Sequence, residues 1–305
     1  MKRIHPRNRL VDWAVAREKL RLQKESGEPP PWTPDPILRE YRFCNVRRRD
    51  DRVSRWLIQN VLSRQDEFSQ WTFLQWSALC RWINWPATLE AALNEDFITH
   101  DGLDFGKIAR LMEARHSYGM KTWTGAYIIR APSKRGGYGG WTKSRFICEE
   151  VVHRGMNAAK DKILEALEEQ RLETIYNVLC DIPNWGQFMA GQVIADWTYT
   201  PVLSMAADLY AWAPMGPGSR RGYNRMMGLP LKHPAPHPEV WNFHLGKWRL
   251  DIVEATCGNF DPNTFTLHDV QNCLCELDKF ERARLGEGRP RARYDWRQGD
   301  LVGGV

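Results

Sequence analysis

The sequence has no run of apolar residues approaching the roughly 18 needed to cross a bilayer, so we expect no membrane-spanning helix. Its first residues, MKRIHPRNRLVDW, lack the apolar segment of a secretory signal, and none is expected. Seven cysteines, an odd number without the spacing of a disulfide framework, indicate reduced thiols and a cytosolic protein. His233 and His237 have no cysteine or carboxylate cluster beside them, so we expect neither a metal nor another cofactor.

What the sequence does contain is enough apolar material for a substantial core. Of its 305 residues, 43% are hydrophobic and 15 are tryptophan, which predicts large side chains in a helical core, aromatic surfaces that stack on bases, or both. The net charge is only +6, but basic residues gather in 42–55, 134–145, 220–225 and 282–297. Separated basic patches suit a polyanion held in a groove, although a solvated surface is the alternative for any one patch.

Helical periodicity dominates the chain, and we predict an all-α fold of about ten helices with at most a small β-hairpin. The one strand-like stretch, 122–130, leads into a glycine-rich basic loop. We expect this loop, with Lys134 and Arg135, either to close over DNA as a basic flap or to be simply a long loop. The proline-rich PPPWTPDP acts as a stiff linker. The expected divisions are 1–35 (N-terminal helix and linker), 36–285 (helical domain) and 286–305 (basic mobile tail).

The segment CNVRRRDDRVSRWL at 44–57 combines arginines with acids at the expected start of a helix. Forked guanidiniums beside free backbone N–H groups suit a phosphate group, and the interleaved acids would orient the forks. The alternative is an exposed, charge-paired helix start. The predicted phosphate ligands of this segment are Asn45, Arg47, Arg48, Asp51 and Arg52.

A second motif, DIPNWGQFMAGQVIAD at 181–196, places a turn between two helices. The helix after the turn begins with free N–H groups, and such a hairpin grips a DNA phosphate without reading the base sequence. An ordinary helical hairpin fits the pattern equally well. Asp196 falls opposite the apolar stripe of the second helix, four residues from Gln192. The predicted DNA contacts are Asn184, Trp185, Gly186, Gln187 and Gln192.

A third motif, GPGSRRGYNR at 216–225, is predicted to be a loop in which glycines let the backbone approach a ligand. It lacks the GxxxxGK[ST] spacing of a Walker loop, which argues against a nucleotide kinase. A surface turn is the alternative. We expect the arginines of this motif and of 44–57 to share one anionic pocket. The predicted phosphate ligands of this motif are Gly216, Gly218, Ser219, Arg220, Arg221 and Asn224.

In this order and spacing, the strings RFCNVRRRDDRVSRWL, WGQFMAGQVIADWTYT and GPGSRRGYNR resemble a phage family, the alpha-glutamyl/putrescinyl thymine pyrophosphorylases, also described as amino acid:DNA transferases. The helical domain of 5-hydroxymethyluracil DNA kinases is similar over the same motifs. The resemblance covers 36–285 and implies a relative of the helix-hairpin-helix DNA glycosylases. The expected fold is therefore an all-α, glycosylase-like, DNA-modifying domain.

Glycosylases of this type carry a catalytic aspartate some way beyond the hairpin glycine, and Asp208 follows Gly186 by 22 positions. The resemblance therefore implies that Asp208 is the catalytic carboxylate, with Asp196 as a second candidate and Asp51 behind it. The hairpin has Asn184 and Trp185 where the glycosylase pattern has a further glycine, and no iron–sulfur cysteine set follows. These departures argue against base excision.

The family resemblance implies a substitution on double-stranded DNA that contains modified thymine. An amine, often a free amino acid, replaces a phosphate or pyrophosphate on the 5-methylene of 5-hydroxymethyluracil. The resemblance also implies a monomeric bacteriophage enzyme acting in the host cytoplasm without a cofactor. The sequence does not identify the amine, the leaving group or the order of bond changes.

Three alternatives to this transferase stay open: a glycosylase or lyase acting on a modified base, a non-catalytic DNA-binding protein, and the helical module of a DNA base kinase. The last is disfavoured because this chain contains no phosphate-binding Walker loop.

Overall fold

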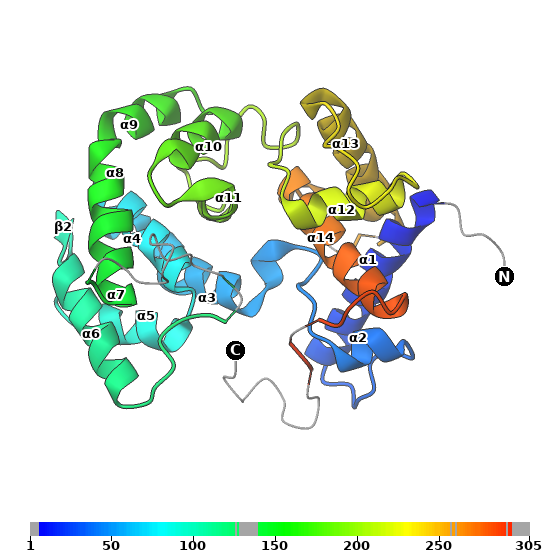
Figure 1. The fold of residues 1–305 in the computed structure, drawn as a ribbon, viewed down its shortest axis with the longest axis horizontal. Coiled ribbons are helices and arrows are strands. Elements are labelled where there is room, and N and C mark those ends of the chain that lie inside the picture. The colour runs from blue at the N-terminus through cyan, green and yellow to red at the C-terminus, as the bar shows by residue number, and fades with distance from the viewer. Residues whose placement is uncertain are drawn as a thin grey trace. The chain divides into compact units, whose positions relative to one another are not determined.

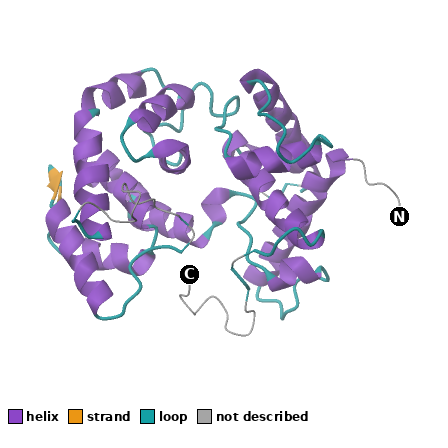
Figure 2. Ribbon diagram, viewed as in Figure 1, coloured by secondary structure: helices purple, strands orange, loops and turns teal. Residues whose placement is uncertain are grey.

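The computed structural model describes residues 6–125, 127, 140–256, 258–259, 261–290 and 292–294. Helices joined by loops make up most of the described chain, and its one sheet is a small antiparallel hairpin (Figure 2), which confirms the all-α prediction. It divides into two compact units, one formed by residues up to 51 together with those from 208 onward, the other by 52–207. Each unit has its own buried core and is described by itself.

The first unit is built around α14. This helix packs against α1, α2, α12 and α13, so segments from both ends of the sequence lie side by side (Figure 1). Proline opens several of these helices at the position where its missing N–H costs nothing. The helices and 3₁₀ turns of this unit are α1 (Pro6–Glu25), α2 (Pro36–Glu40), η1 (Arg48–Asp50), α12 (Pro217–Met226), α13 (Pro238–Ala255), η4 (Pro262–Thr264) and α14 (Leu267–Arg284).

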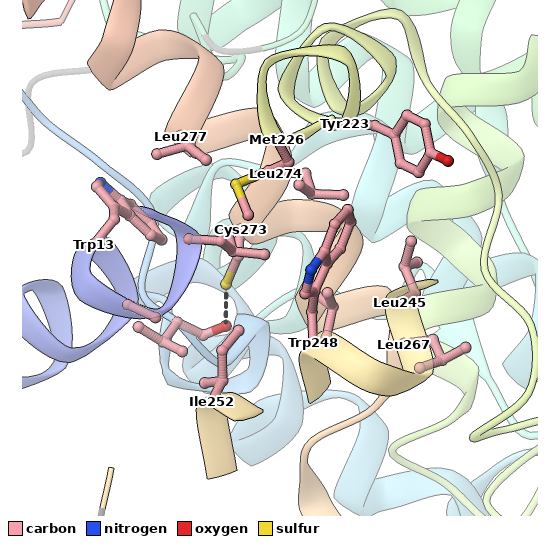
Figure 3. Packing of buried hydrophobic residues seen from close by; sticks show 14 of the residues in the cluster. Trp13, Tyr223, Met226, Leu245, Trp248, Ile252, Leu267, Cys273, Leu274 and Leu277 are labelled. Carbon is pink, nitrogen blue, oxygen red and sulfur yellow. Dashed lines mark hydrogen bonds between the residues drawn. The ribbon is translucent and has the colours of Figure 1, made fainter. Parts of the chain in front are cut away.

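Aromatic and aliphatic side chains from α1, α12, α13 and α14 fill the core of this unit (Figure 3). Trp13, Trp248 and Leu277 are among its buried members. The thiol of Cys273 faces the same core and donates to the backbone oxygen of Val46 at 3.4 Å. That contact attaches the arginine-rich segment before η1 to the middle of α14.

The motif at 216–225 is a helix, which corrects the prediction of a loop. Gly216 is the N-cap of α12, Pro217 is its first residue, and the Ser219 hydroxyl accepts the backbone N–H of Gly216. The glycines serve close packing. A Cβ on Gly222 would lie 2.1 Å from the carbonyl oxygen of Leu274 in α14. The sequence pattern therefore marks a close helix crossing and not a flexible ligand loop.

The crossing of α12 and α14 predicts a large packing effect. Gly222→Ala forces a methyl group into a backbone carbonyl, which cannot rotate away, so we expect unfolding to become easier by about 3 kcal/mol or more. Gly246→Ala in α13 is the control, because a Cβ there meets nothing within 4 Å and alanine favours helix. Urea unfolding followed by circular dichroism checks both. A Gly222→Ala protein as stable as wild type would contradict the close crossing.

The second unit surrounds α4, in which every residue from 72 to 83 is buried. Helices α11, η3 and α5 pack against it, and α10 packs against α11. The elements of this unit are α3 (Arg52–Asn60), η2 (Leu62–Glu67), α4 (Gln70–Ile83), α5 (Pro86–Leu93), β1 (Ile98–Thr99), β2 (Gly102–Leu103), α6 (Phe105–Ser117), α7 (Lys143–Arg145), η3 (a π-helix, Phe146–Arg154), α8 (Gly155–Ala158), α9 (Lys160–Glu168), α10 (Leu172–Asp181) and α11 (Gly186–Trp197).

The small hairpin lies before the stretch expected to contain a strand. Strands β1 and β2 pair with Ile98 opposite Leu103. In the predicted strand at 122–130, the described residues 122–125 and 127 are loop, and the others lie outside the described residues.

Tryptophans supply the large side chains of the second core. Trp76 and Trp197 are completely buried, and the Trp197 indole donates to the Ser77 hydroxyl at 2.9 Å. Trp82 packs edge-on against Trp185 at 6.0 Å between ring centroids. Among the described residues, tryptophans therefore pack in the cores of both units, which agrees with the prediction of large side chains in a helical core.

Candidate active site

The arginine segment of the first unit forms a tight turn that is held by its own acids. Arg47 makes two hydrogen bonds to the Asp50 carboxylate, at 2.7 and 3.1 Å, and a third to the Thr264 hydroxyl at 3.1 Å. The backbone N–H of Arg48 donates to Asp269 in α14 at 2.8 Å. Asp50 thus orients the Arg47 guanidinium, as the interleaving of acids and arginines predicted. Arg52, the first residue of α3, is exposed.

Asn45 and Asp51 brace this turn from inside. The Asn45 side chain donates to the backbone oxygen of Asp50 at 2.7 Å, and its own N–H donates to Asp51 at 2.7 Å. Burial raises the pKa of Asp51 to about 6, against the opposing effects of the Asn45 N–H and nearby arginines. The contacts of Asn45 hold the chain in place, and its role as a phosphate ligand stays a prediction.

A buried histidine lies beside the turn. His268, near the start of α14, is 4% exposed, and neither ring nitrogen has a hydrogen-bond partner among the described residues. Burial, followed by the positive charge of Arg48, lowers the pKa of His268 to about 3. At neutral pH the ring is therefore neutral, with one nitrogen that can donate and one that can accept.

The predicted catalytic Asp208 begins a short turn whose last residue, Trp212, contacts this histidine. Its backbone oxygen accepts the N–H groups of Ala211 and Trp212, both at 2.9 Å, and Asp208 itself is 4% exposed. The Trp212 ring meets His268 edge-on at 5.8 Å between centroids. We refer to Arg48, Trp212, His268 and Asp269 as the His268 cluster. It combines a guanidinium, an indole ring, a neutral imidazole and a carboxylate, and Asp208 begins the turn that carries its Trp212.

The neutral state of His268 has a consequence for stability. The unfolded chain, with an ordinary histidine pKa near 6.5, takes up a proton below that pH, whereas the folded chain does not until about pH 3. The free energy of unfolding of the wild-type protein therefore falls as the pH drops below 6.5, because only the unfolded chain gains a proton at His268. The His268→Leu protein lacks this loss, so its free energy of unfolding relative to wild type should rise by about 2 kcal/mol between pH 7 and pH 5. Urea unfolding of both proteins at the two pH values measures it; an unchanged difference would contradict a buried neutral ring.

Several residues of the 216–225 motif have structural roles. The Ser219 hydroxyl is completely buried and bonded to Gly216 and to Gln271. Asn224, also buried, donates to the backbone oxygens of Leu231 and His233 at 3.2 and 3.1 Å. These side chains are enclosed and bonded within the protein, and their role as phosphate ligands stays a prediction.

The basic side chains of α12 differ from one another. Arg221 pairs with Asp278 at 2.8 Å. Arg220 is half-buried, and its Nε has no hydrogen-bond partner in the part of the chain that the structure describes.

The two arginine motifs contact different faces of α14. The segment at 44–48 bonds to Asp269, Cys273 and Glu276, whereas Arg221 bonds to Asp278. Asp269 and Asp278 are nine residues apart, about 13 Å along the axis and half a turn around it. Those contacts do not bring Arg221 to the pocket expected around Arg48, so the common pocket stays a prediction for Arg220 alone.

In the second unit, Asp196 forms a buried ion pair with Arg81 of α4. The two groups make two hydrogen bonds, one of them at 2.5 Å, and are 1% and 3% exposed. Ser54 and Asn84 accept the remaining guanidinium N–H groups, at 3.2 and 2.9 Å. Burial alone would lower the pKa of Arg81, but the charges of Asp196 and Tyr127 and the hydrogen bonds to them together outweigh it and raise that pKa above its ordinary value. Asp196 is thus enclosed, which the sequence did not indicate.

The helical hairpin is present, and its tip is exposed. Asn184 and Gly186 have φ angles of +71° and +63°, and the turn joins α10 to α11. Trp185 is buried and donates its indole N–H to the backbone of Val151 at 3.0 Å, so this side chain anchors the turn. Gln187 is exposed at the start of α11. The contact of this turn's backbone with a DNA phosphate stays a prediction.

Gln192, the last predicted contact of the hairpin, accepts the Tyr127 hydroxyl at 3.2 Å. Lys134 and Arg135 lie outside the described residues. The described part of the chain contains no group of three or more potential metal ligands, and no described helix is long and apolar enough to cross a membrane.

Comparison with known proteins identifies the family. Residues 6–289 match 5-hmdU DNA kinase, helical domain. The chain belongs to this family. A 5-hmdU DNA kinase of Bacillus phage SP10 is 26% identical to it over 208 residues, which are 64% of this chain and 32% of that protein. The chain thus aligns with about a third of the relative's length. No solved structure matches it.

The match to the hmdU kinase helical domain confirms one of the two relationships expected from the motifs. It spans both units and includes all three motifs. Sequence reasoning missed His268 and Arg81, which lie outside those motifs. The capping box formed by Thr266 and Asp269 marks the start of the helix that carries His268, and it is the local sequence signal nearest to this residue.

Proposed function

We propose that this protein is a bacteriophage DNA hypermodification enzyme that acts on phosphorylated or pyrophosphorylated 5-hydroxymethyluracil in double-stranded DNA. An amine, in our proposal a free amino acid, replaces the phosphate group on the 5-methylene. The family match supports an activity on hydroxymethyluracil DNA, and the His268 cluster is the observation that carries the choice of chemistry.

The reaction needs three kinds of assistance. The carbon–oxygen bond of the 5-methylene breaks, and its electron pair leaves with the phosphate or pyrophosphate. A bond from the amine nitrogen to the same carbon forms, and the nitrogen loses a proton. Because the base lies inside the duplex, it must first be flipped into a pocket. Cationic donors are needed where the departing oxygen gains charge, and a base is needed for the amine proton.

Asp208 and the His268 cluster offer groups for the last two tasks. In our proposal Asp208 accepts the proton of the incoming amine. Arg48, with Arg47 beside it, attracts the departing phosphate, and Arg220 is a further cation of the same unit. The neutral ring of His268 contributes a hydrogen bond to the leaving oxygen or to the base. The exposed turn at 183–187 holds a DNA phosphate through its backbone.

A second candidate function follows from the family itself. The relative from phage SP10 is a DNA kinase three times longer than the aligned stretch, so this helical region could instead present a hydroxymethyluracil base to a kinase domain. In that case Arg47 and Arg48 would bind the DNA and no leaving group would depart from the base.

Product analysis separates the candidates. The protein is incubated with duplexes carrying hydroxymethyluracil, with and without a ³²P-labelled phosphate on the 5-methylene, in the presence of an amino acid mixture. Our proposal predicts that labelled phosphate is released from an intact strand and that release depends on amine. Binding of the unphosphorylated hydroxymethyluracil duplex, with no release of label from the phosphorylated one, would support the kinase module, and abasic sites would support a glycosylase.

A further inference from the structure

A hollow of about 690 Å³ opens on the surface of the second unit. Its wall comes from the β1–β2 hairpin, the first turns of α6, and the helices α7 and η3, which lie side by side (Figure 1). Phe105 contributes a buried ring, and the exposed His153 ring stacks on it at 4.6 Å, with 13° between the planes. This hollow contains none of the residues assigned to the reaction above.

Opposite charges converge at one point of its wall, where Gly106 has no side chain. A Cβ built on Gly106 would lie 3.4 Å from Nη1 of Arg110, 3.5 Å from Oδ1 of Asp104 and 4.0 Å from Oε1 of Glu149. A small ligand at this point would therefore meet a guanidinium and two carboxylates at once.

The carboxylates are held in place by their neighbours. Asp104 caps α6 and accepts the Lys107 N–H at 2.8 Å, and this bond holds the pKa of Asp104 below its ordinary value. Glu149 accepts from Arg145 at 3.0 Å, and Arg145 lies 4.6 Å from the centre of the Trp141 ring. The charge of Arg110 contributes to lowering the pKa of Asp104, but within the described residues no hydrogen bond or salt bridge uses the N–H groups of Arg110, so they can donate to a ligand.

We propose that this hollow binds a free α-amino acid as a zwitterion. The α-carboxylate pairs with Arg110, the α-ammonium group lies between Asp104 and Glu149, and the side chain lies over the stacked rings of His153 and Phe105. A simple anion would be repelled by the two carboxylates, and a simple cation by the arginines. This binding is a property of the second unit alone and goes beyond the proposed function.

Binding can be tested on the intact protein without DNA. Saturation-transfer NMR with each of the twenty standard amino acids ranks the ligands, and isothermal titration then compares the tightest one with its amide and with its analogue lacking the amine. Each analogue loses one charge-assisted contact and should bind at least about tenfold more weakly. Binding of acetate or inorganic phosphate as tight as that of the amino acid, or no amino acid binding, would overturn the proposal.

Two variants place the ligand in this hollow. Gly106→Leu fills the point of convergence while favouring helix, and Arg110→Gln removes the carboxylate partner; each should weaken binding at least about tenfold. Arg154→Gln is the matched control. Arg154 is an exposed arginine that pairs with Glu150 as Arg145 pairs with Glu149, and it does not line the hollow. Wild-type affinity in folded Gly106→Leu protein would place the ligand elsewhere.

The failure of this inference and the failure of the proposed function give different results. If amines are transferred to DNA but no amino acid binds in the hollow, this inference is wrong and the function stands. If the zwitterion binds as described but no phosphorylated DNA is converted, the binding site stands and the function is wrong.

Discussion

An Asp208→Asn protein should bind modified DNA normally and transfer amine at least about a thousandfold more slowly than wild type, within the range that general-base groups contribute. The amide has nearly the shape of the carboxylate but cannot accept the amine proton. Because Asp208 initiates a turn through its backbone oxygen, which the substitution keeps, the fold should be preserved. Initial rates at saturating amine and gel-shift affinity for the same duplex provide the two measurements.

Asp12→Asn is the matched control for this experiment. Asp12 is an exposed carboxylate of α1 in the same unit, so its loss should leave the transfer rate unchanged. Full transfer activity in Asp208→Asn at saturating amine would remove Asp208 from the mechanism. His268 would then be the group of the cluster to test for the proton transfer.

Asp196→Ala should lower the free energy of unfolding by about 3–5 kcal/mol, because it leaves the Arg81 guanidinium buried without its counter-charge. Replacing both groups with apolar residues, in Arg81→Met together with Asp196→Leu, should recover much of that loss, since no uncompensated charge then stays in the core. Urea unfolding of the two proteins measures the difference.

The exposed pair formed by Arg64 and Glu67 is the control for the buried one. Both of its side chains are in solvent, so Glu67→Gln should change stability little. If Asp196→Ala were as stable as wild type, the ion pair would not hold α4 and α11 together. If instead it folded normally but lost transfer activity, the reserve role in catalysis that the sequence suggested for Asp196 would gain support.

Periodicity predicted the all-α class because the burial of a helix face depends on local spacing, and the structure confirms that class. The exception is instructive. At 216–225 the same local signals, two glycines and a proline, also describe a helix start, and only the approach of α14 to Gly222 decides between loop and helix.

The site was less predictable because it depends on contacts between distant segments. Nothing near Asp196 in the sequence indicates that Arg81, 115 positions away, will cover its carboxylate. His268 likewise becomes unusual only when Trp212 and Arg48 enclose it. Arg47, in contrast, has its acidic partner Asp50 three residues away, so its orientation by that acid was predictable.

The most direct test of the proposed function is mass spectrometry of the nucleosides from DNA treated with the protein. A duplex carrying 5-phosphoryloxymethyl or 5-pyrophosphoryloxymethyl deoxyuridine is incubated with the protein and the twenty standard amino acids, then digested completely. The account predicts a new nucleoside whose mass equals the thymidine skeleton joined through its 5-methylene to an amine nitrogen, formed with wild type and not with Asp208→Asn. Recovery of the phosphorylated nucleoside unchanged from both duplexes would contradict it.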